Sequence, residues 1–531
     1  MRYPVETFTP DEEALLRPHF TNLDRPVFCL VNLPETVKGA LFARYSRYPG
    51  TLRRLFLEEF AADVPDAGRP FDGVEGERAA GLYERVFMGY GDDSIAQVGG
   101  AHLACEWVSN ILTKVLQRGR LAAYLEQSTR YIPYDQPMPA DAGGGYRYYA
   151  DDELGEAYRS GMDELFGIYS RGLETVQGWA AERWPRGEEP EAAWRRSIRA
   201  KALDLLRGLL PASTLSHVGV FASGQAYEQL LLRLAASPLP EARAYGEMIH
   251  AELEKVMPSF VARVKRPDRG GEWIDYLRGR REATERAVAR LGLDRPAEGD
   301  APSVDLIAVE GGEEDLLAAS LFESAAASES EIRRRIDGLD PLERADLIAD
   351  LAGERPNRRH RPGRGWEAVR YRFEIVSDYG GFRDLQRHRM LTCQWQQLGP
   401  HLGAGVPEEV REAGAGDEYE RALELSRLEF ERLRDAGLAD AAPYALCLGY
   451  RIRYVLDLNA REAMHLIELR SGREGHPTYR AVAQAMYERI AAVHPAIARA
   501  MSHVDSSREP RLERILSEIR THRKRLTATR R

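Results

Sequence analysis

Two short arginine clusters in this chain have residue types that could hold an anion. The first lies within LQRHRMLTCQ (385–394) and consists of Arg387, His388 and Arg389. The second lies within LQRGRLAAYLEQSTRY (116–131), where a glycine stands between Arg118 and Arg120. Guanidinium groups stay charged under working conditions and match phosphate oxygens with two parallel hydrogen bonds. Because neighbouring cations are costly to pack without water or an anion, both clusters indicate an anionic ligand.

A further group of candidate residues lies on NAREAMHLIELR (459–470), which has a helical pattern. Asn459, Arg461 and His465 fall within two turns of this helix. Arg470 follows about three turns after Asn459 and can share its face. If the helix begins at Asn459, its first N–H groups add a preference for an anion. Taken separately these signals are weak, because an isolated Arg-His-Arg is usually a solvated surface cluster and such a helix usually shows a polar face.

The combination resembles the flavin-dependent thymidylate synthases, whose signature RHRxxSxNxxSxRY is followed later by an NAR helix carrying Leu-Arg. In the second half of the chain the matching segments are GWE (365–367), RHRMLTCQWQQLGPH (387–401), NAR (459–461) and LR (469–470). In the first half they are GYGDDSIAQ (89–97), RGRLAAYLEQSTRY (118–131), LRGLLP (206–211) and LR (232–233). The resemblance therefore implies a tandem duplication.

The resemblance also implies roles for the matching residues. Arg470 would stabilise the negative charge that develops on the uracil ring. The positions that hold FAD in the family correspond to Arg387, His388, Arg389, Glu367, Asn459, Arg461 and His465. The positions that hold the nucleotide correspond to Arg118, Arg120, Gln127, Ser128, Arg130, Tyr131, Arg207 and Arg233. For His465, a purely structural role is an equal alternative.

Each half departs from the family signature in a different place. The first half has Gly119 where the signature has histidine, and Ser-Gly-Gln (223–225) where it has NAR. The second half has Leu398 and Pro400 where the signature has the Ser and Arg of its SxRY arm. These complementary losses favour a composite site, with flavin-binding groups from the second half and nucleotide-binding groups from the first. A homodimer would then imitate the homotetramer of the family. The alternative is decay of both sites into a scaffold.

The reaction that the resemblance implies is the reductive methylation of dUMP, or of a related pyrimidine nucleotide, with dUMP giving dTMP. Methylenetetrahydrofolate would donate the carbon, and NADPH would reduce the FAD. Two rival functions stay open. One is a flavin- or nucleotide-binding homologue without activity, and the other is a structural or partner-binding protein.

The sequence patterns around these residues predict an α+β fold. We expect two tandem flavin-dependent thymidylate synthase-like domains, each rich in helix and each with a small, mostly antiparallel sheet that follows from the resemblance. The expected boundaries are a first repeat at 20–263, a linker at 264–302, a second repeat at 303–503 and a basic tail at 504–531. Within the repeats, RPVFCLVNLP (25–34) and SVDLIAVE (303–310) have the patterns of strands. The tail is expected to be solvated or docked on an acidic neighbour.

Composition narrows the classes of protein further. The 531 residues exceed the roughly 250–300 that one core usually holds. The net charge of −9, from 74 basic and 83 acidic residues, argues against generic nucleic-acid binding. Four scattered cysteines predict neither disulfides nor a structural metal site, and they fit a reducing cytoplasm. The acidic start of the sequence is unlike a signal peptide, and no apolar run reaches the length of about 18 residues that a membrane span needs.

Overall fold

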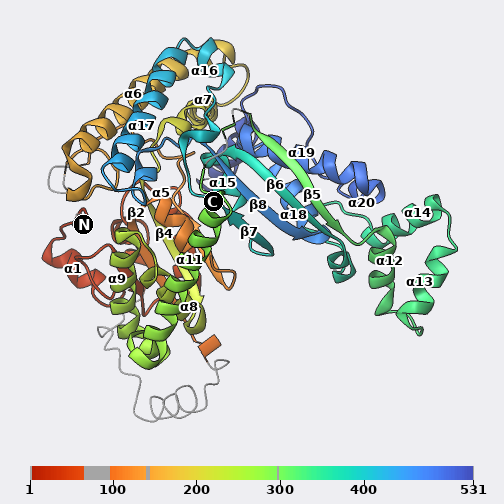
Figure 1. Cartoon of the computed structure of the whole chain (residues 1–531). Coiled ribbons are helices and arrows are strands. Elements are labelled where there is room, and N and C mark those ends of the chain that lie inside the picture. Colours follow the sequence, from red (N-terminus) through yellow and green to blue (C-terminus); the bar gives the residue numbers. More distant parts are fainter. Residues whose placement is uncertain are drawn as a thin grey trace. The chain divides into compact units, whose positions relative to one another are not determined.

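The computed structural model describes residues 3–64, 96–97, 99–138, 144–295, 298–299 and 301–529 of the chain. Helices surround two separate four-stranded sheets, one formed by each half of the sequence (Figure 1). The predicted α+β fold with two helix-rich domains is therefore confirmed.

The two sheets have the same topology. The first follows the order β1-β2-β4-β3, with strands β1 (Val27–Leu30), β2 (Gly100–Ser109), β3 (Ala122–Glu126) and β4 (Leu215–Ser223). The second follows the order β5-β6-β8-β7, with strands β5 (Ser303–Glu310), β6 (Arg370–Asp378), β7 (Leu391–Trp395) and β8 (Arg451–Asn459). Every neighbouring pair is antiparallel. The predicted strands at 25–34 and 303–310 are β1 and β5.

Corresponding helices follow corresponding strands. A short helix after β2 and β6 leads into the arginine cluster of each half, and these helices are α5 (Asn110–Leu116) and α15 (Tyr379–Leu385). Two longer helices follow β4, namely α8 (Gly224–Ala235) and α9 (Pro240–Val256). Their counterparts after β8 are α18 (Ala460–Arg470) and α19 (Pro477–Val493). This shared order of elements confirms the tandem duplication that the sequence motifs imply.

The remaining helices lie before, between and after these elements. In the first half they are α1 (Pro10–Leu16), α2 (Glu35–Tyr45), α3 (Leu52–Glu59), α6 (Gly155–Arg183), α7 (Glu191–Leu206), α10 (Pro258–Val261) and α11 (Glu272–Arg290). In the second half they are α12 (Glu313–Phe322), α13 (Glu329–Asp337), α14 (Pro341–Ala352), α16 (Glu408–Glu412), α17 (Gly416–Asp435), α20 (Pro495–Arg499) and α21 (Ile515–Thr529). The segment expected as a linker at 264–302 thus contains α11.

Each turn from a central strand into its helix is closed by a polar cap. The side chains of Ser109, Ser223, Asp378 and Asn459 each accept a hydrogen bond from a backbone N–H in the first turn of the following helix. Such a cap satisfies a donor that the helix itself leaves unpaired and contributes about 1 kcal/mol. The sequence therefore fixes where α5, α8, α15 and α18 begin.

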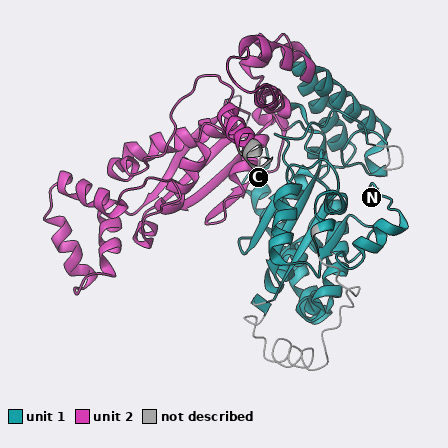
Figure 2. Cartoon of the chain, turned by 180° about the vertical axis from the view of Figure 1, so that it is seen from behind, with its two compact units in different colours: residues 1–172, 209–297, 418–447 teal, residues 173–208, 298–417, 448–531 magenta. Residues whose placement is uncertain are grey.

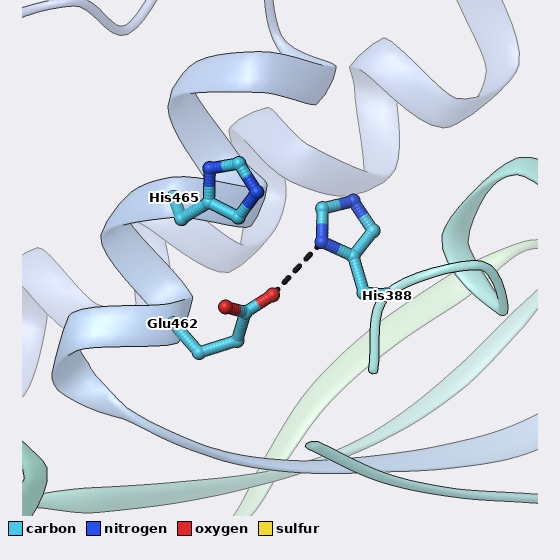
Figure 3. Close-up of side chains that lie close together, drawn as sticks. All are labelled: His388, Glu462 and His465. Carbon is cyan, nitrogen blue, oxygen red and sulfur yellow. Dashed lines mark hydrogen bonds and ion pairs between the residues drawn. The ribbon is translucent and has the colours of Figure 1, made fainter. Parts of the chain in front are cut away.

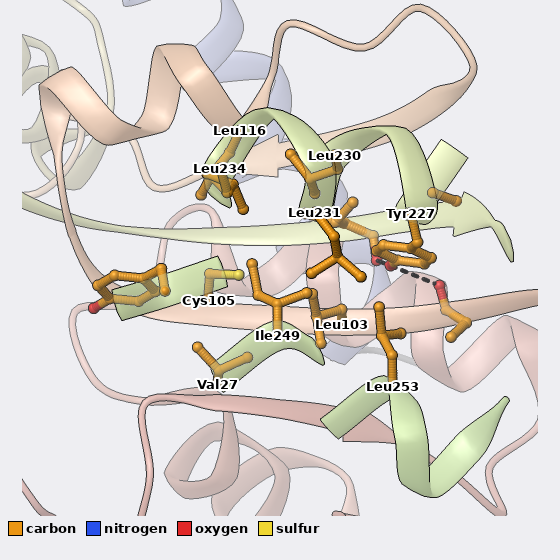
Figure 4. Packing of buried hydrophobic residues seen from close by; sticks show 14 of the residues in the cluster. Val27, Leu103, Cys105, Leu116, Tyr227, Leu230, Leu231, Leu234, Ile249 and Leu253 are labelled. Atoms are coloured by element: carbon orange, nitrogen blue, oxygen red, sulfur yellow. Dashed lines mark hydrogen bonds between the residues drawn. The ribbon is translucent and has the colours of Figure 1, made fainter. Parts of the chain in front are cut away.

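Alternating apolar residues bury one face of each sheet against helices. In the first sheet, Val27, Leu103 and Cys105 pack with residues of α8 and α9, such as Tyr227 and Ile249 (Figure 4). In the second sheet the buried positions alternate along β8 and much of β6, and they include Tyr371, Phe373, Ile375, Ile452, Tyr454, Leu456 and Leu458. Each fully buried large aliphatic or aromatic side chain stabilises the fold by about 1.5–3 kcal/mol.

The chain divides into two compact units that do not coincide with the two halves of the sequence (Figure 2). Unit 1 comprises residues 1–172, 209–297 and 418–447. Unit 2 comprises residues 173–208, 298–417 and 448–531. Helix α7 of the first half thus belongs to unit 2, and most of α17 of the second half belongs to unit 1.

Within unit 2, buried ion pairs join α7 to the C-terminal segment. Lys201 Nζ lies 2.9 Å from a Glu513 carboxylate oxygen, and Arg514 Nη2 lies 2.8 Å from Asp204 Oδ1. All four side chains are at most 4% exposed. The beginning of the tail is therefore docked on α7, through one ion pair in which the tail supplies the carboxylate and one in which it supplies the guanidinium.

Two further expectations concern cysteines and membranes. All four cysteines are free, with Cys29, Cys105 and Cys447 buried and Cys393 half-buried. In the described part of the chain, no helix combines the length and the apolar composition needed to cross a bilayer.

Candidate functional site

Helices α15 and α18 bring the arginine cluster at 387–389 together with the NAR helix in unit 2. The two helices start from opposite ends of the paired strands β6 and β8, and both pack on these strands. The residues that follow α15 therefore meet the side of α18. His388 comes from this loop, whereas Glu462 and His465 come from α18 (Figure 3).

A chain of hydrogen bonds joins three of these side chains. Arg470 Nε donates to His388 Nε2 over 3.0 Å, and His388 Nδ1 lies 2.9 Å from Glu462 Oε1 (Figure 3). The guanidinium can only donate, so His388 Nε2 must be the acceptor. The proton of the neutral imidazole therefore lies on Nδ1, from which it is donated to Glu462.

Burial sets the charges in this cluster. Burial lowers the pKa of His388 well below its usual value, and the neighbouring Arg470 lowers it further. Burial, together with Arg361, also lowers the pKa of His465 to about 4. The pKa of Glu462 is raised to about 7 by burial, although Arg361 and two other arginines act in the opposite direction. Both imidazoles are therefore neutral at neutral pH.

His388, Glu462 and His465 could by composition hold a metal ion, because they offer three ligand atoms within 4.8 Å of one another. A neutral imidazole that binds a metal carries its proton on the other nitrogen, usually facing an acceptor. Here His388 Nε2 faces Arg470, and His465 Nδ1 lies 3.1 Å from Arg361 Nη2. Both arginines are donors. The cluster is therefore arranged for hydrogen-bonded neutral histidines rather than for a cation.

Three arginines from the predicted set converge on one carboxylate, that of Asp384 at the end of α15. Arg207 Nη1 lies 3.2 Å from Asp384 Oδ2, and Arg470 Nη1 lies 3.9 Å from Asp384 Oδ1. Arg387 also forms an ion pair with Asp384. This arrangement provides several guanidinium donors for an anion, but an internal carboxylate already lies among them.

Arg207 reaches this position because α7 belongs to unit 2. It caps the C-terminal end of α7, and its side chain is only 3% exposed. Its guanidinium packs against the start of α15, where a Cβ atom added to Gly380 would lie 3.2 Å from Arg207 Nε. A glycine at this position leaves the room that the arginine occupies. A nucleotide-binding residue predicted in the first half thus lies beside flavin-binding residues predicted in the second.

Substituting Asp384 by asparagine should raise the affinity of unit 2 for inorganic phosphate or dUMP about tenfold, or about 1.4 kcal/mol. The change removes a negative charge that competes with the ligand for the three arginines. Isothermal titration calorimetry of the full chain measures the effect. The exposed Asp350→Asn substitution is the matched control and should leave the affinity unchanged. An unchanged or lower affinity in a folded Asp384→Asn protein would show that the carboxylate serves the structure alone.

The other predicted flavin-binding residues lie at the start of α18, in the loop before β7 and, for Glu367, in the short helical turn before β6. Asn459 is the cap of α18 and accepts a hydrogen bond from Glu462 N over 2.9 Å. Arg461 Nε donates to Pro362 O over 2.9 Å, and Arg461 Nη1 lies 3.7 Å from Glu367 Oε1. Arg389 is half-buried in the loop. The structure thus brings Glu367 and Arg461 together, as part of one local network.

In unit 1, the position between Arg118 and Arg120 that is histidine in the family signature is occupied by Gly119, and a side chain there would have to displace Tyr124. A Cβ atom added to Gly119 would lie 2.8 Å from the Tyr124 hydroxyl, which itself donates to Gly119 O over 3.2 Å. Burial lowers the pKa of Arg233, and so does the nearby charge of Arg118. Gly119 thus lies beside Tyr124 and near Arg233, while Arg120 is exposed.

The SxRY arm of the first half forms a turn after β3. Ser128 Oγ accepts a hydrogen bond from Arg130 N over 3.2 Å. The guanidinium of Arg47 lies 4.7 Å from the centre of the Tyr131 ring. Gln127, by contrast, is buried, and its side chain forms hydrogen bonds with Tyr48 O and with the guanidinium of Arg147. Of the motif GYGDDSIAQ, residues 89–95 lie outside the described part of the chain.

Three residues of the unit 2 site are missing from the set predicted from the sequence: Asp384, Glu462 and Arg361. Asp384 and Glu462 do have a weak signal, because each lies next to a predicted motif. Asp384 stands three residues before Arg387, and Glu462 directly follows the NAR triplet. Arg361 has no such signal, because the loop that carries it meets His465 only through the tertiary fold.

Comparison with known proteins places these motifs in a family. The sequence profile of the thymidylate synthase complementing protein family matches residues 57–259 and 314–496. A UPF0159 protein of Chlamydia muridarum is 36% identical over 538 residues, covering 97% of this chain and 98% of that protein. A UPF0159 protein of Thermoplasma acidophilum is 30% identical over 515 residues, covering 91% and 98% of the two chains. Among solved structures, a UMP/dUMP methylase from Streptomyces cacaoi bound with 5-Br dUMP is 21% identical to this chain, with a TM-score of 0.32. The match covers 39% of this chain and 98% of the methylase chain.

Proposed function

Because the chain belongs to the thymidylate synthase complementing protein family, we propose that it catalyses the FAD-dependent reductive methylation of dUMP, or of a closely related pyrimidine nucleotide. Methylenetetrahydrofolate is the proposed carbon donor, and NADPH is the proposed reductant of the flavin. The proposal is supported most directly by Arg470, a cation held rigidly in a largely buried site among other arginines.

The surroundings of Arg470 suit the stabilisation of a developing negative charge. Its side chain is 16% exposed, and its guanidinium lies 5.6 Å from the centre of the Tyr479 ring. His388 accepts from its Nε, and its Nη1 lies 3.9 Å from Asp384 Oδ1. A preorganised donor in a poorly solvated site needs little rearrangement as charge builds up on a pyrimidine ring.

The predicted flavin-binding residues fit an anionic cofactor in their donor chemistry. The side chains of Arg387 and Arg461 are 37% and 32% exposed, so both retain surface that a ligand can contact. Guanidinium groups hold pyrophosphate well and favour a reduced, anionic flavin ring. We assign FAD binding to Arg387, His388, Arg389, Glu367, Asn459, Arg461 and His465. Bound FAD supplies the hydride that completes the methyl group.

The position of Arg207 supports a site that draws on both repeats. This residue belongs to the first repeat, yet it is buried beside Asp384 of the second repeat. We assign it to the phosphate of the nucleotide, with Asp384 as the carboxylate that the phosphate replaces. A homodimer of the chain would hold four repeats, which is the number in a family homotetramer.

Purified protein should carry FAD or take it up, giving a visible flavin spectrum. Arg387→Ala should abolish this signal, because it removes a charged donor at the cofactor. Arg130→Ala should keep the flavin and weaken dUMP binding about tenfold. The exposed Arg434→Ala substitution is the control for loss of charge and should change neither.

The same titrations separate the rival functions. Flavin binding without measurable dUMP affinity would identify a homologue that has lost the reaction. Protein that neither carries nor takes up FAD would contradict the proposal and favour a structural or partner-binding role.

A further inference from the structure

Glu462 is the one carboxylate in the cluster of His388, Glu462 and His465 (Figure 3). It lies in the first turn of α18, directly after the NAR triplet, and its side chain is 6% exposed. The motifs of the sequence assign it no role. Its placement between two histidines and several arginines calls for one, because a buried carboxylate without a function is costly to retain.

We propose that Glu462 is a positioning residue whose carboxylate fixes the tautomer of His388 and, through it, the orientation of Arg470. This inference rests on the proposed function only for the catalytic role assigned to Arg470. The tautomer itself follows from the hydrogen bonds of the structure and is tested without substrate.

The first step concerns the proton of His388. In its neutral form this imidazole has one donor nitrogen and one acceptor nitrogen. Glu462 Oε1, at 2.9 Å from Nδ1, keeps the proton on that side. The lone pair then lies on Nε2, where Arg470 Nε donates over 3.0 Å.

The second step is the consequence of losing this acceptor. With an apolar side chain at position 462, the proton on Nδ1 would lose its acceptor, and only the hydrogen bond from Arg470 would still favour that tautomer. On Nε2 the proton would face the N–H of Arg470 Nε, and two donors cannot share a hydrogen bond. Either the imidazole or the guanidinium must then move, and a displacement of about 1 Å at such a site is enough to lower a rate about 10²-fold.

His465 is the second neutral histidine of the cluster, and it also faces an arginine. Arg361 Nη2 lies 3.1 Å from His465 Nδ1, so this nitrogen accepts and the proton lies on Nε2. The imidazoles of His388 and His465 lie with their ring centres 5.3 Å apart. Each imidazole therefore has one nitrogen that accepts from an arginine and another that is protonated. Glu462 is the acceptor for the protonated nitrogen of His388.

Charge balance explains why the acceptor is a carboxylate. Burial raises the pKa of Glu462 to about 7, whereas Arg361, Arg461 and Arg470 each favour its ionised form. A neutral acceptor would satisfy His388 but would leave these cations without a compensating charge. The hydrogen bond and the charge of Glu462 can therefore be separated by two substitutions.

The experiment compares Glu462→Gln with Glu462→Leu in the full-length chain. Side-chain nitrogen NMR of protein labelled with ¹⁵N-histidine, with His388 assigned by substitution, reports its tautomer. The wild type should show a neutral ring with the proton on Nδ1 that does not titrate between about pH 5 and 8. Glu462→Gln keeps an acceptor oxygen and should keep this signal, whereas Glu462→Leu should shift the proton toward Nε2.

Turnover supplies the second readout. Glu462→Leu should lower kcat about 10–100-fold, whereas Glu462→Gln should stay within about threefold of the wild type. The exposed Glu488→Leu substitution controls for the loss of a glutamate and should leave kcat unchanged. Far-UV circular dichroism confirms that each variant is folded.

The outcomes distinguish this inference from the proposed function. A wild type that binds no flavin contradicts the proposed function, and the NMR signals still test the positioning role. A wild-type His388 with its proton on Nε2, or a Glu462→Leu protein with unchanged tautomer and kcat, would overturn the inference. Equal losses in the Gln and Leu variants, with the tautomer kept in both, would overturn it as well.

Discussion

Replacing Arg470 with methionine should lower kcat for nucleotide methylation about 10²–10³-fold, while the flavin stays bound. Methionine retains much of the volume of the side chain but removes the charge and the donors. The structure holds this guanidinium through His388 and over the ring of Tyr479, so its position is prepared before the substrate arrives. A donor prepared in this way acts on the transition state more strongly than on the bound substrate. Steady-state kinetics with dUMP as substrate measure the change.

Arg473→Met is the matched control for this experiment. Arg473 lies three residues further along the chain and is exposed, so its loss should leave kcat unchanged. If Arg470→Met lowered only the affinity for dUMP and kept kcat, Arg470 would bind the ground state and the transition state equally. The assigned catalytic role would then be wrong.

Replacing Glu468 with alanine should lower the free energy of unfolding by about 3–5 kcal/mol. Glu468 lies on α18 between the site and the end of the helix, and it forms two hydrogen bonds with Arg355 over 2.7 and 2.5 Å. Both side chains are at most 2% exposed. Loss of the carboxylate leaves a guanidinium buried without its counter-charge. The free-energy cost of that unpaired charge is larger than the net stabilisation that the ion pair contributes. Urea denaturation followed by circular dichroism measures the change.

The double substitution Arg355→Met with Glu468→Leu provides the control. It removes both charges and fills much of the same volume, so most of the lost stability should return. A double variant as unstable as Glu468→Ala would show that packing, rather than the buried charge, sets the cost. Unchanged stability in Glu468→Ala would contradict the importance of the pair.

The sequence predicts much of the fold because local signals coincide with the elements. Alternating apolar residues predict β5, and small polar residues mark the turns where helices begin. Asn459 illustrates this, since its type and its place before an apolar helix identify it as a cap. The long charged helix α11, by contrast, has no buried residues, so its composition is similar to that of the linker expected there.

The site is only partly visible in the sequence, because its parts depend on tertiary contacts. Arg387, His388, Arg461 and Arg470 can be identified from motifs, since their spacing is local. The role of Asp384 depends on the approach of Arg207, which lies 177 positions earlier in the chain. Glu462 similarly acquires its partner only when α18 meets the loop that carries His388. Neither contact leaves a periodic pattern that a single sequence can show.

The distribution of helices between the two units has a consequence for the history of the gene. Helix α7 is encoded in the first half of the gene but completes unit 2, and α17 is encoded in the second half but contributes to unit 1. Neither half of the gene therefore encodes a whole unit. Deletion of one copy would damage both units at once, which makes the duplication difficult to reverse. The two halves also depart from the family signature at different positions, so a single copy would lack both a whole unit and part of that signature.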